Sequence, residues 1–245
     1  MNDTRLARAV AQEAGQLLIA LRASGRYHGR LLGDEGDRQA NALILERLRA
    51  ARPGDFILSE ESVDDRARCA ASRVWIVDPL DGTREYTEGL DDWAVHIGLA
   101  IDGLPLAGAV AVPALDRTYA TDDPPCPRAP CSRLTIAVSR TRAPEIARCA
   151  ADTLGAAMLP MGSAGAKAMA VVEGRADAYL HDGGQYEWDN CAPAAVALAA
   201  GLHASRIDGS PLVYNCENPL LPDLLICRSE IAPDMLAAIE AARSR

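Results

Sequence analysis

The residues most suited to chemistry are two aspartates three positions apart. They belong to the motif Asp-Pro-Leu-Asp-Gly-Thr at 78–83, which directly follows the apolar segment 74–77. The proline stiffens the chain and the glycine permits a tight bend, so Asp78, Asp81 and the carbonyl of Leu80 can meet at one point. Mg²⁺ and similar hard cations prefer such oxygen ligands. The alternative is a solvated turn, because Asp, Pro and Gly are common turn formers.

Two further acidic clusters lie at the ends of expected elements. Glu60 closes an apolar segment that begins at Phe56, so it could reach the same point from a neighbouring strand, although it could also be a surface acid opening a loop. Asp189 precedes an Ala-rich helix and could either complete a metal site or serve only as the N-cap of that helix. Three acidic clusters at element ends favour a divalent metal site more than any one of them alone.

The first half of the chain has to position most of these carboxylates. Leu6, Val10 and Leu17 recur at helical spacing, which predicts an amphipathic first helix, and Arg-Pro-Gly at 52–54 ends a second one. The following apolar segments alternate with turn residues such as Asp-Gly at 102–103, which indicates strands. The expected elements are helices over 3–23 and 37–51 and strands over 56–60, 74–77, 93–102, 106–112 and 117–121.

A proline-rich break separates the two halves of the sequence. Four prolines occur within 122–130, which excludes regular structure there. We therefore predict an α+β lobe over 1–130, which carries most metal ligands, and an α/β lobe over 131–245, which completes the site. The expected elements of the second lobe are strands over 134–138, 157–161, 176–181, 202–207 and 223–228, and helices over 144–155, 163–173, 189–200 and 231–243.

Composition excludes several classes of function. The 245 residues carry a formal net charge of −9, which argues against a nucleic-acid-binding surface. Only 4% of them are aromatic, which argues against binding of single strands by stacked aromatic side chains. A hydrophobic fraction of 49% supports a folded core. No apolar run of about 18 residues predicts a membrane span. The seven scattered cysteines and the absence of an apolar leader predict a cytoplasmic protein with free thiols. We expect it to be a monomer or a homodimer.

Taken in order, these motifs resemble the signatures of the inositol monophosphatase superfamily, a group of Mg²⁺-dependent, lithium-inhibited phosphatases. The resemblance rests on Glu60-Glu61-Ser62, on the motif at 78–83 and on Trp188-Asp189 with Ala-Pro-Ala at 192–194. The continuation Arg-Glu-Tyr at 84–86 is similar to the CysQ-type 3'(2'),5'-bisphosphate nucleotidases, in particular their actinobacterial branch. The resemblance implies a two-lobed, layered α/β/α/β/α sandwich of the inositol monophosphatase and fructose-1,6-bisphosphatase type.

The same resemblance implies a role for each matching residue. Two or three Mg²⁺ ions would be held by Glu60, Asp78, the Leu80 carbonyl, Asp81 and Asp189. Thr83 and Asp37 would form a dyad that takes a proton from the attacking water, with help from Glu60. The implied substrate contacts are Gly82, Thr83, Arg84, Arg140, Gly162, Ser163, Lys167, His181 and Asp189. His28, His96 and His203 are expected to be structural.

The implied activity is removal of the 3'-phosphate of 3'-phosphoadenosine 5'-phosphate, giving AMP and phosphate. A further candidate substrate is 3'-phosphoadenosine 5'-phosphosulfate, which would link the enzyme to sulfate assimilation. His181 stands where relatives usually place an arginine for the second phosphate, so inositol or fructose bisphosphate phosphatase activity remains an alternative. Lys167 and Arg140 are then candidate phosphate anchors or ordinary surface charges. A non-catalytic metal or phosphate sensor is a remote alternative, which the Asp37–Thr83 pair disfavours.

Overall fold

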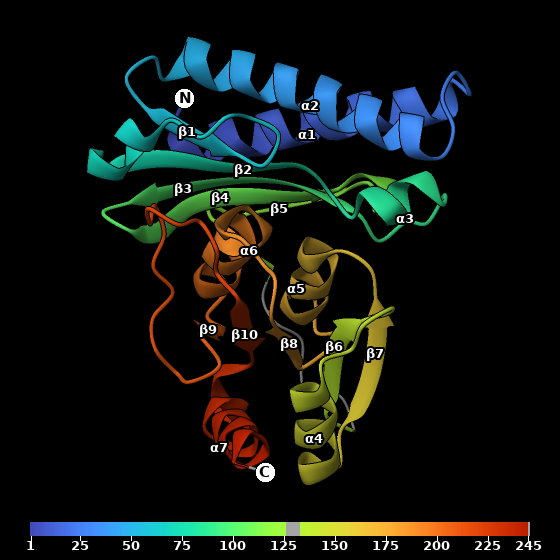
Figure 1. Ribbon diagram of the computed structural model, residues 1–245, viewed down its shortest axis with the longest axis vertical. Helices are drawn as coiled ribbons and strands as arrows, with labels where there is room; N and C mark the ends of the chain where they lie inside the picture. Colours follow the sequence, from blue (N-terminus) through green and yellow to red (C-terminus); the bar gives the residue numbers. More distant parts are fainter. Residues whose placement is uncertain (126–132, 245) are drawn as a thin grey trace.

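The computed structural model describes residues 1–125 and 133–244, and helices alternate with two sheets along this part of the chain (Figure 1). The helices are α1 (Asp3–Ala23), α2 (Arg30–Ala51), α3 (Thr83–Thr87), α4 (Glu145–Leu154), α5 (Ala164–Val172), α6 (Glu187–Ala199) and α7 (Ala232–Arg243). The strands are β1 (Phe56–Ser59), β2 (Arg73–Asp81), β3 (Ala94–Ile101), β4 (Leu104–Val112), β5 (Arg117–Ala120), β6 (Thr135–Ser139), β7 (Ala157–Met161), β8 (Ala178–Asp182), β9 (His203–Ser205) and β10 (Asp223–Cys227).

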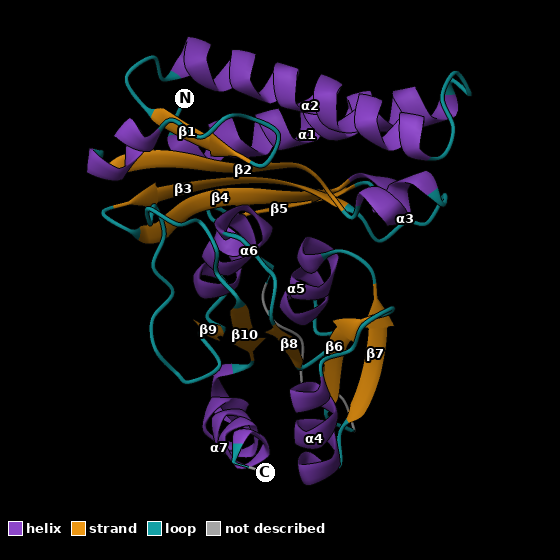
Figure 2. Cartoon of the chain, viewed as in Figure 1, coloured by secondary structure: helices purple, strands orange, loops and turns teal. Residues whose placement is uncertain are grey.

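Five layers follow one another along the long axis of the molecule. The pair α1 and α2 covers one face of the first sheet, α5 and α6 lie between the two sheets, and α4 and α7 cover the far face of the second sheet (Figure 2). This arrangement confirms the predicted α/β/α/β/α sandwich. Short 3-10 turns connect some of the elements.

The first sheet brings two of the acidic clusters side by side. Its order is β1-β2-β3-β4-β5, with β1 parallel to β2 and the other pairs antiparallel. The register pairs Ser59 with Val77, so Glu60, which follows β1, comes next to Asp78 of β2. The pairing of β2 with β3 shifts between Asp78 and Asp81, and such an irregularity re-aims side chains.

The segment 74–77 of β2 is apolar throughout because both faces of its sheet are buried. Trp75 and Val77 pack against the α1–α2 layer, whereas Val74 and Ile76 pack against the α5–α6 layer, as the period of two requires. The same alternation turns Asp78 toward the α5–α6 layer. The helices of that layer therefore begin next to the acidic end of β2.

The second sheet has the order β7-β6-β8-β10-β9. Strand β6 is parallel to β7 and β8, whereas β10 is antiparallel to both of its neighbours. A third apolar cluster, which includes Ile136, Leu225 and Met235, joins this sheet to α4 and α7. Every strand and helix predicted beyond residue 133 is present; the strand over 157–161 has the predicted bounds, and the others are shifted by one to a few residues at one or both ends.

Several element ends differ from the predictions. Helix α2 begins at Arg30 and not near residue 37, so it includes Gly33. A Cβ at Gly33 would lie 2.7 Å from the Thr83 methyl carbon, so glycine here permits the close approach of α2 to α3. Strand β2 extends to Asp81 through the proline, and α3 was not predicted. The predicted lobe boundary near residue 130 lies outside the described residues.

Candidate active site

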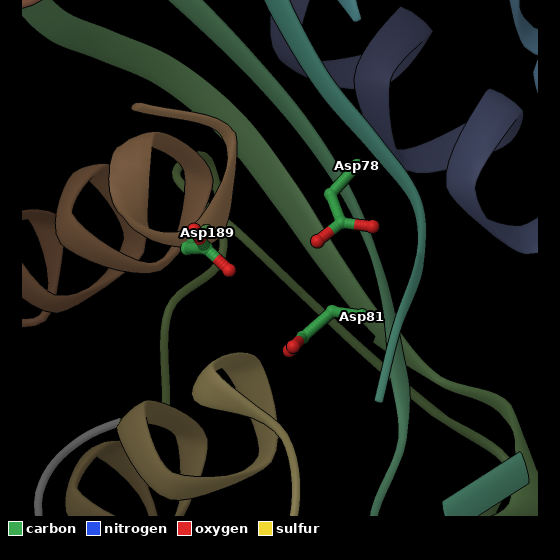
Figure 3. A group of neighbouring side chains, drawn as sticks. All are labelled: Asp78, Asp81 and Asp189. Carbon is green, nitrogen blue, oxygen red and sulfur yellow. The ribbon is translucent and has the colours of Figure 1, made fainter. Parts of the chain in front are cut away.

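Three carboxylates from distant parts of the sequence meet beside the end of β2. Asp78 and Asp81 come from that strand, and Asp189 comes from the first turn of α6 (Figure 3). One oxygen from each residue lies within 4.8 Å of the others, and the three side chains point toward a shared space. Oxygen donors at this spacing suit a hard divalent cation.

Asp81 also joins the first sheet to helix α5 of the layer between the sheets. Its carboxylate accepts hydrogen bonds from the backbone N–H groups of Ala164 (3.1 Å) and Gly165 (2.6 Å), at the start of α5. His96 Nε2 lies 3.1 Å from Asp81 Oδ2. Burial alone would raise the pKa of Asp81, but the charges of His96 and Lys167 and the Gly165 hydrogen bond lower it. Asp81 is therefore held as an anion.

The neighbouring carboxyls have the opposite tendency. Asp78 is 1% exposed and accepts a hydrogen bond from the Leu80 N–H at 3.0 Å. Burial, followed by the charge of Glu60, raises the pKa of Asp78 well above its ordinary value. Burial and the charge of Asp189 raise the pKa of Glu60 to about 7, while a hydrogen bond with Asp78 opposes this rise. The chain supplies too little positive charge for these carboxylates, so the donor set fits a bound cation.

The predicted Asp37–Thr83 pair is brought together by α2 and α3. Thr83 Oγ1 donates to the Leu80 carbonyl at 3.1 Å, and the same hydroxyl lies near enough to the Asp37 carboxyl to oppose the rise of its pKa. Burial, followed by the charges of Glu61 and Glu60, raises the pKa of Asp37 to about 8. The hydroxyl thus links the carboxyl of α2 to a backbone oxygen beside the acidic cluster.

Asp189 has two roles at the start of α6. The helix begins at Glu187, so Tyr186 is its N-cap residue and Asp189 is its third residue, which differs from the predicted N-cap at Asp189. The Asp189 carboxylate accepts a hydrogen bond from the Tyr186 N–H at 2.6 Å. Burial, partly opposed by this hydrogen bond and reinforced by the charge of Asp81, raises the pKa of Asp189 to about 6.

The backbone amides expected to hold phosphate at 162–164 are already engaged. Asp92 accepts from the N–H of Gly162 at 2.6 Å through its carboxylate and from the N–H of Ser163 at 3.1 Å through its carbonyl. The Ser163 hydroxyl accepts from the N–H of Ala166 at 3.0 Å. In this structure, the N–H groups of Gly162 and Ser163 therefore bind the start of α5 to the loop that precedes β3. The other predicted amides, of Gly82 and Thr83, begin α3, where a helix leaves N–H groups without helical partners.

The arginines predicted to contact substrate lie in ion pairs. Arg84 pairs with Glu88 at 3.1 Å on the exposed surface of α3. Arg140, which follows β6, pairs with Glu85 at 3.4 Å and with Asp92. Arg140 therefore crosses between the two sheets close to the start of α5.

Lys167 and His181 have buried surroundings. Lys167 is 4% exposed and donates to the carbonyls of Gly162 and Ser163, so it is not an ordinary surface charge. Burial lowers its pKa to about 8. His181 Nε2 lies 2.9 Å from the Gly183 carbonyl, and burial lowers the pKa of this histidine, which favours its neutral form.

His96 and Asp92 are the site residues that the sequence interpretation missed. His96 was expected to be merely structural, yet it is fully buried against Asp81. A Cβ at Gly165 would lie 2.1 Å from His96 Nε2, so glycine is needed for this contact. The one sequence signal for both is the segment Asp-Asp-Trp-Ala-Val-His at 91–96, which is similar to the actinobacterial branch of the CysQ-type nucleotidases.

Comparisons with known proteins agree with this geometry. Residues 4–243 match the model of the inositol monophosphatase family. The "3'-phosphoadenosine 5'-phosphate phosphatase" of Mycobacterium bovis is 55% identical, over 93% of this chain and 89% of that protein. The "3'(2'),5'-bisphosphate nucleotidase CysQ" of Escherichia coli is 33% identical over 73% and 77%. The crystal structure of CysQ from Bacteroides thetaiotaomicron superposes with a TM-score of 0.80 at 26% identity, covering 93% of this chain and 97% of that one.

Proposed function

The chain belongs to the inositol monophosphatase family, and from this membership we propose that it is a phosphatase that removes the 3'-phosphate of 3'-phosphoadenosine 5'-phosphate. The products are AMP and phosphate. The observation that carries the chemistry is the meeting of Asp78, Asp81 and Asp189 within 4.8 Å. The relatives that act on this nucleotide support the choice of substrate.

The cation that we propose is Mg²⁺, with two or three ions held by Glu60, Asp78, the Leu80 carbonyl, Asp81 and Asp189. When bound, Mg²⁺ supplies positive charge that stabilises phosphoryl oxygens and lowers the pKa of the attacking water. The raised pKa values of Asp78 and Glu60 support this proposal, because they indicate carboxylates that lack a compensating charge.

The residues of the chain itself would then orient the reactants and move the proton. Thr83 would accept the proton of the attacking water and pass its own to the ionised form of Asp37, which the Thr83 hydroxyl favours. The backbone N–H groups of Gly82 and Thr83 would donate to phosphate oxygens. Asp81 would keep its position because two amides of α5 hold both of its oxygens.

Arg140 is the charged group that we propose for the second phosphate, since its guanidinium lies between the sheets close to the start of α5. Lys167 would act indirectly, by holding the Gly162–Ser163 turn. The cytoplasmic location, the oligomeric state and activity on 3'-phosphoadenosine 5'-phosphosulfate stay predictions from the sequence.

Phosphate release tests this function directly. The chain would be assayed with 3'-phosphoadenosine 5'-phosphate, inositol 1-phosphate and fructose 1,6-bisphosphate, each with Mg²⁺, with a chelator and with added Li⁺. We expect Mg²⁺-dependent, Li⁺-suppressed activity with the highest kcat/KM on the nucleotide. Equal or faster turnover of a sugar phosphate would refute the assignment of substrate. Binding of Mg²⁺ without turnover of any of these esters would instead favour a sensor.

A further inference from the structure

One aromatic ring is exposed beside the acidic cluster. Tyr186 is 40% exposed, whereas the chain's other aromatic rings, all within the described residues, are buried or half-buried. Its backbone N–H donates to the Asp189 carboxylate at 2.6 Å, so the residue that carries this ring is bonded to a proposed metal ligand. Exposing a large ring is unfavourable in water, and in this aromatic-poor chain it needs an explanation.

The ring of Tyr186 is also held flat. It stacks on Trp188 with 4.7 Å between ring centroids and an interplanar angle of 7°. Trp188 is half-buried, packs against the apolar core between the sheets, and has its carbonyl 3.1 Å from His96 Nδ1. One face of the tyrosine ring is therefore covered by a fixed neighbour, and the exposed fraction belongs to the remaining surface.

The chain around this stack is held on both sides. Tyr186 forms an antiparallel bridge with Leu220, whose side chain is 42% exposed. The carboxylate of Glu187, 1% exposed, accepts from the N–H groups of Asn215 (2.7 Å) and Cys216 (2.8 Å). The backbone that carries the exposed side chains of Tyr186 and Leu220 is thus held by hydrogen bonds on both sides.

We propose that the exposed face of Tyr186, backed by Trp188, is the stacking surface for the adenine base of the substrate. This inference rests on the proposed nucleotide phosphatase function, and it makes Tyr186 a specificity residue. A planar base can stack on an aromatic ring, whereas an inositol or fructose ring has no flat π-face. Since stacking is tolerant of base identity, the surface selects a nucleoside over a sugar and does not discriminate among bases.

Two experiments test the stacking surface. In the first, KM and kcat are measured for Tyr186→Ala with 3'-phosphoadenosine 5'-phosphate and with inositol 1-phosphate. In the second, calorimetry in the presence of Mg²⁺ compares the binding of AMP with that of ribose 5-phosphate, which lacks the base. We expect Tyr186→Ala to raise the nucleotide KM and the AMP dissociation constant about tenfold, or about 1.4 kcal/mol, with a change below about twofold for the two compounds without a base.

Two control variants sharpen the comparison. Tyr186→Phe keeps the ring and is expected to retain the preference for AMP. Leu106→Ala truncates a residue of β4 that is 56% exposed. It is expected to leave the KM of both substrates and the dissociation constants of AMP and ribose 5-phosphate unchanged. Equal losses with both ligands, or none, in Tyr186→Ala would overturn the stacking surface. If the unsubstituted chain turned over only inositol 1-phosphate, the proposed function itself would fail, and the variants would not be needed to show it.

Discussion

Adding a methyl group at Gly165 is expected to push α5 away from the first sheet at the point where Asp81 joins them. The new Cβ would lie 2.1 Å from His96 Nε2 and 3.0 Å from the Ala94 Cβ. Ordinary contact begins at 3.4 Å, so the ring and the helix must part by about 1.3 Å. Overpacking of this kind costs about 1–3 kcal/mol, and the better helix propensity of alanine returns at most about 1 kcal/mol. We expect Gly165→Ala to lose about 2 kcal/mol of unfolding free energy.

The same displacement should weaken metal binding. The Gly165 N–H is 2.6 Å from the Asp81 carboxylate, and moving the helix stretches this hydrogen bond. Asp81 would then lose part of the restraint that orients it toward Asp78 and Asp189. The Mg²⁺ concentration that gives half-maximal phosphate release is expected to rise several-fold.

Urea denaturation followed by tryptophan fluorescence provides the assay, with the midpoint and the slope fitted separately. Gly54→Ala is the matched control, because no heavy atom lies within 4 Å of a Cβ at that position. It should stay within about 0.5 kcal/mol of the unsubstituted protein.

A double-mutant cycle tests the cause of the loss. In Gly165→Ala combined with His96→Ala the main steric conflict is gone, so the two losses should not add, with a coupling of at least about 1 kcal/mol. Additive losses would refute the steric argument. So would an unchanged midpoint for Gly165→Ala alone.

Three other predictions follow from the site. Asp37→Asn and Thr83→Ala should each lower kcat about 100-fold or more while the Mg²⁺ affinity measured by calorimetry stays nearly unchanged, because neither side chain is proposed as a metal ligand. With a chelator present, thermal stability should fall as pH rises from about 4 to about 8. The folded-state pKa values of Asp37 (about 8), Glu60 (about 7) and Asp189 (about 6) exceed those of the unfolded chain, so the folded state binds more protons in that window. A melting temperature that does not change over this pH range would contradict the prediction. Arg140→Ala should lower the free energy of unfolding measured by urea denaturation by less than about 1 kcal/mol, since its ion pairs are partly exposed. The same change should raise the KM for 3'-phosphoadenosine 5'-phosphate several-fold, and an unchanged KM would exclude Arg140 from the substrate site.

Local patterns were sufficient for most of the fold. Helix α1 was predicted with the observed bounds, because its apolar residues repeat at helical spacing from Leu6 to Leu21. The start of α2 could not be predicted in this way, because Gly33 suits the helix only through its contact with Thr83. The extension of β2 to Asp81 likewise depends on its pairing with β3, which the proline in the sequence argues against.

The candidate site was harder to predict where it depends on contacts between the sheets. The acidic residues themselves could be chosen from their positions at element ends. Nothing local, however, indicates that the amides at 162–165 are taken by Asp92 and Asp81, or that His96 lies against Asp81. The amides and their aspartates are 70 or more residues apart, and His96 lies on the strand next to that of Asp81, so only the tertiary structure brings these groups together.

The hydrogen bonds that Asp81 accepts from α5 span 83 and 84 positions along the chain. They can therefore form only late in the synthesis of the chain. A nascent chain that has left the ribosome only as far as the first sheet carries Asp78 and Asp81 without Asp189 or the amides of α5. In such an intermediate the face of the first sheet toward the α5–α6 layer is uncovered, so Asp78 and Asp81 are open to water and the third carboxylate of the cluster is missing. Tight metal binding would therefore mark a chain whose two sheets have docked, and cation affinity could serve as a measure of completed folding.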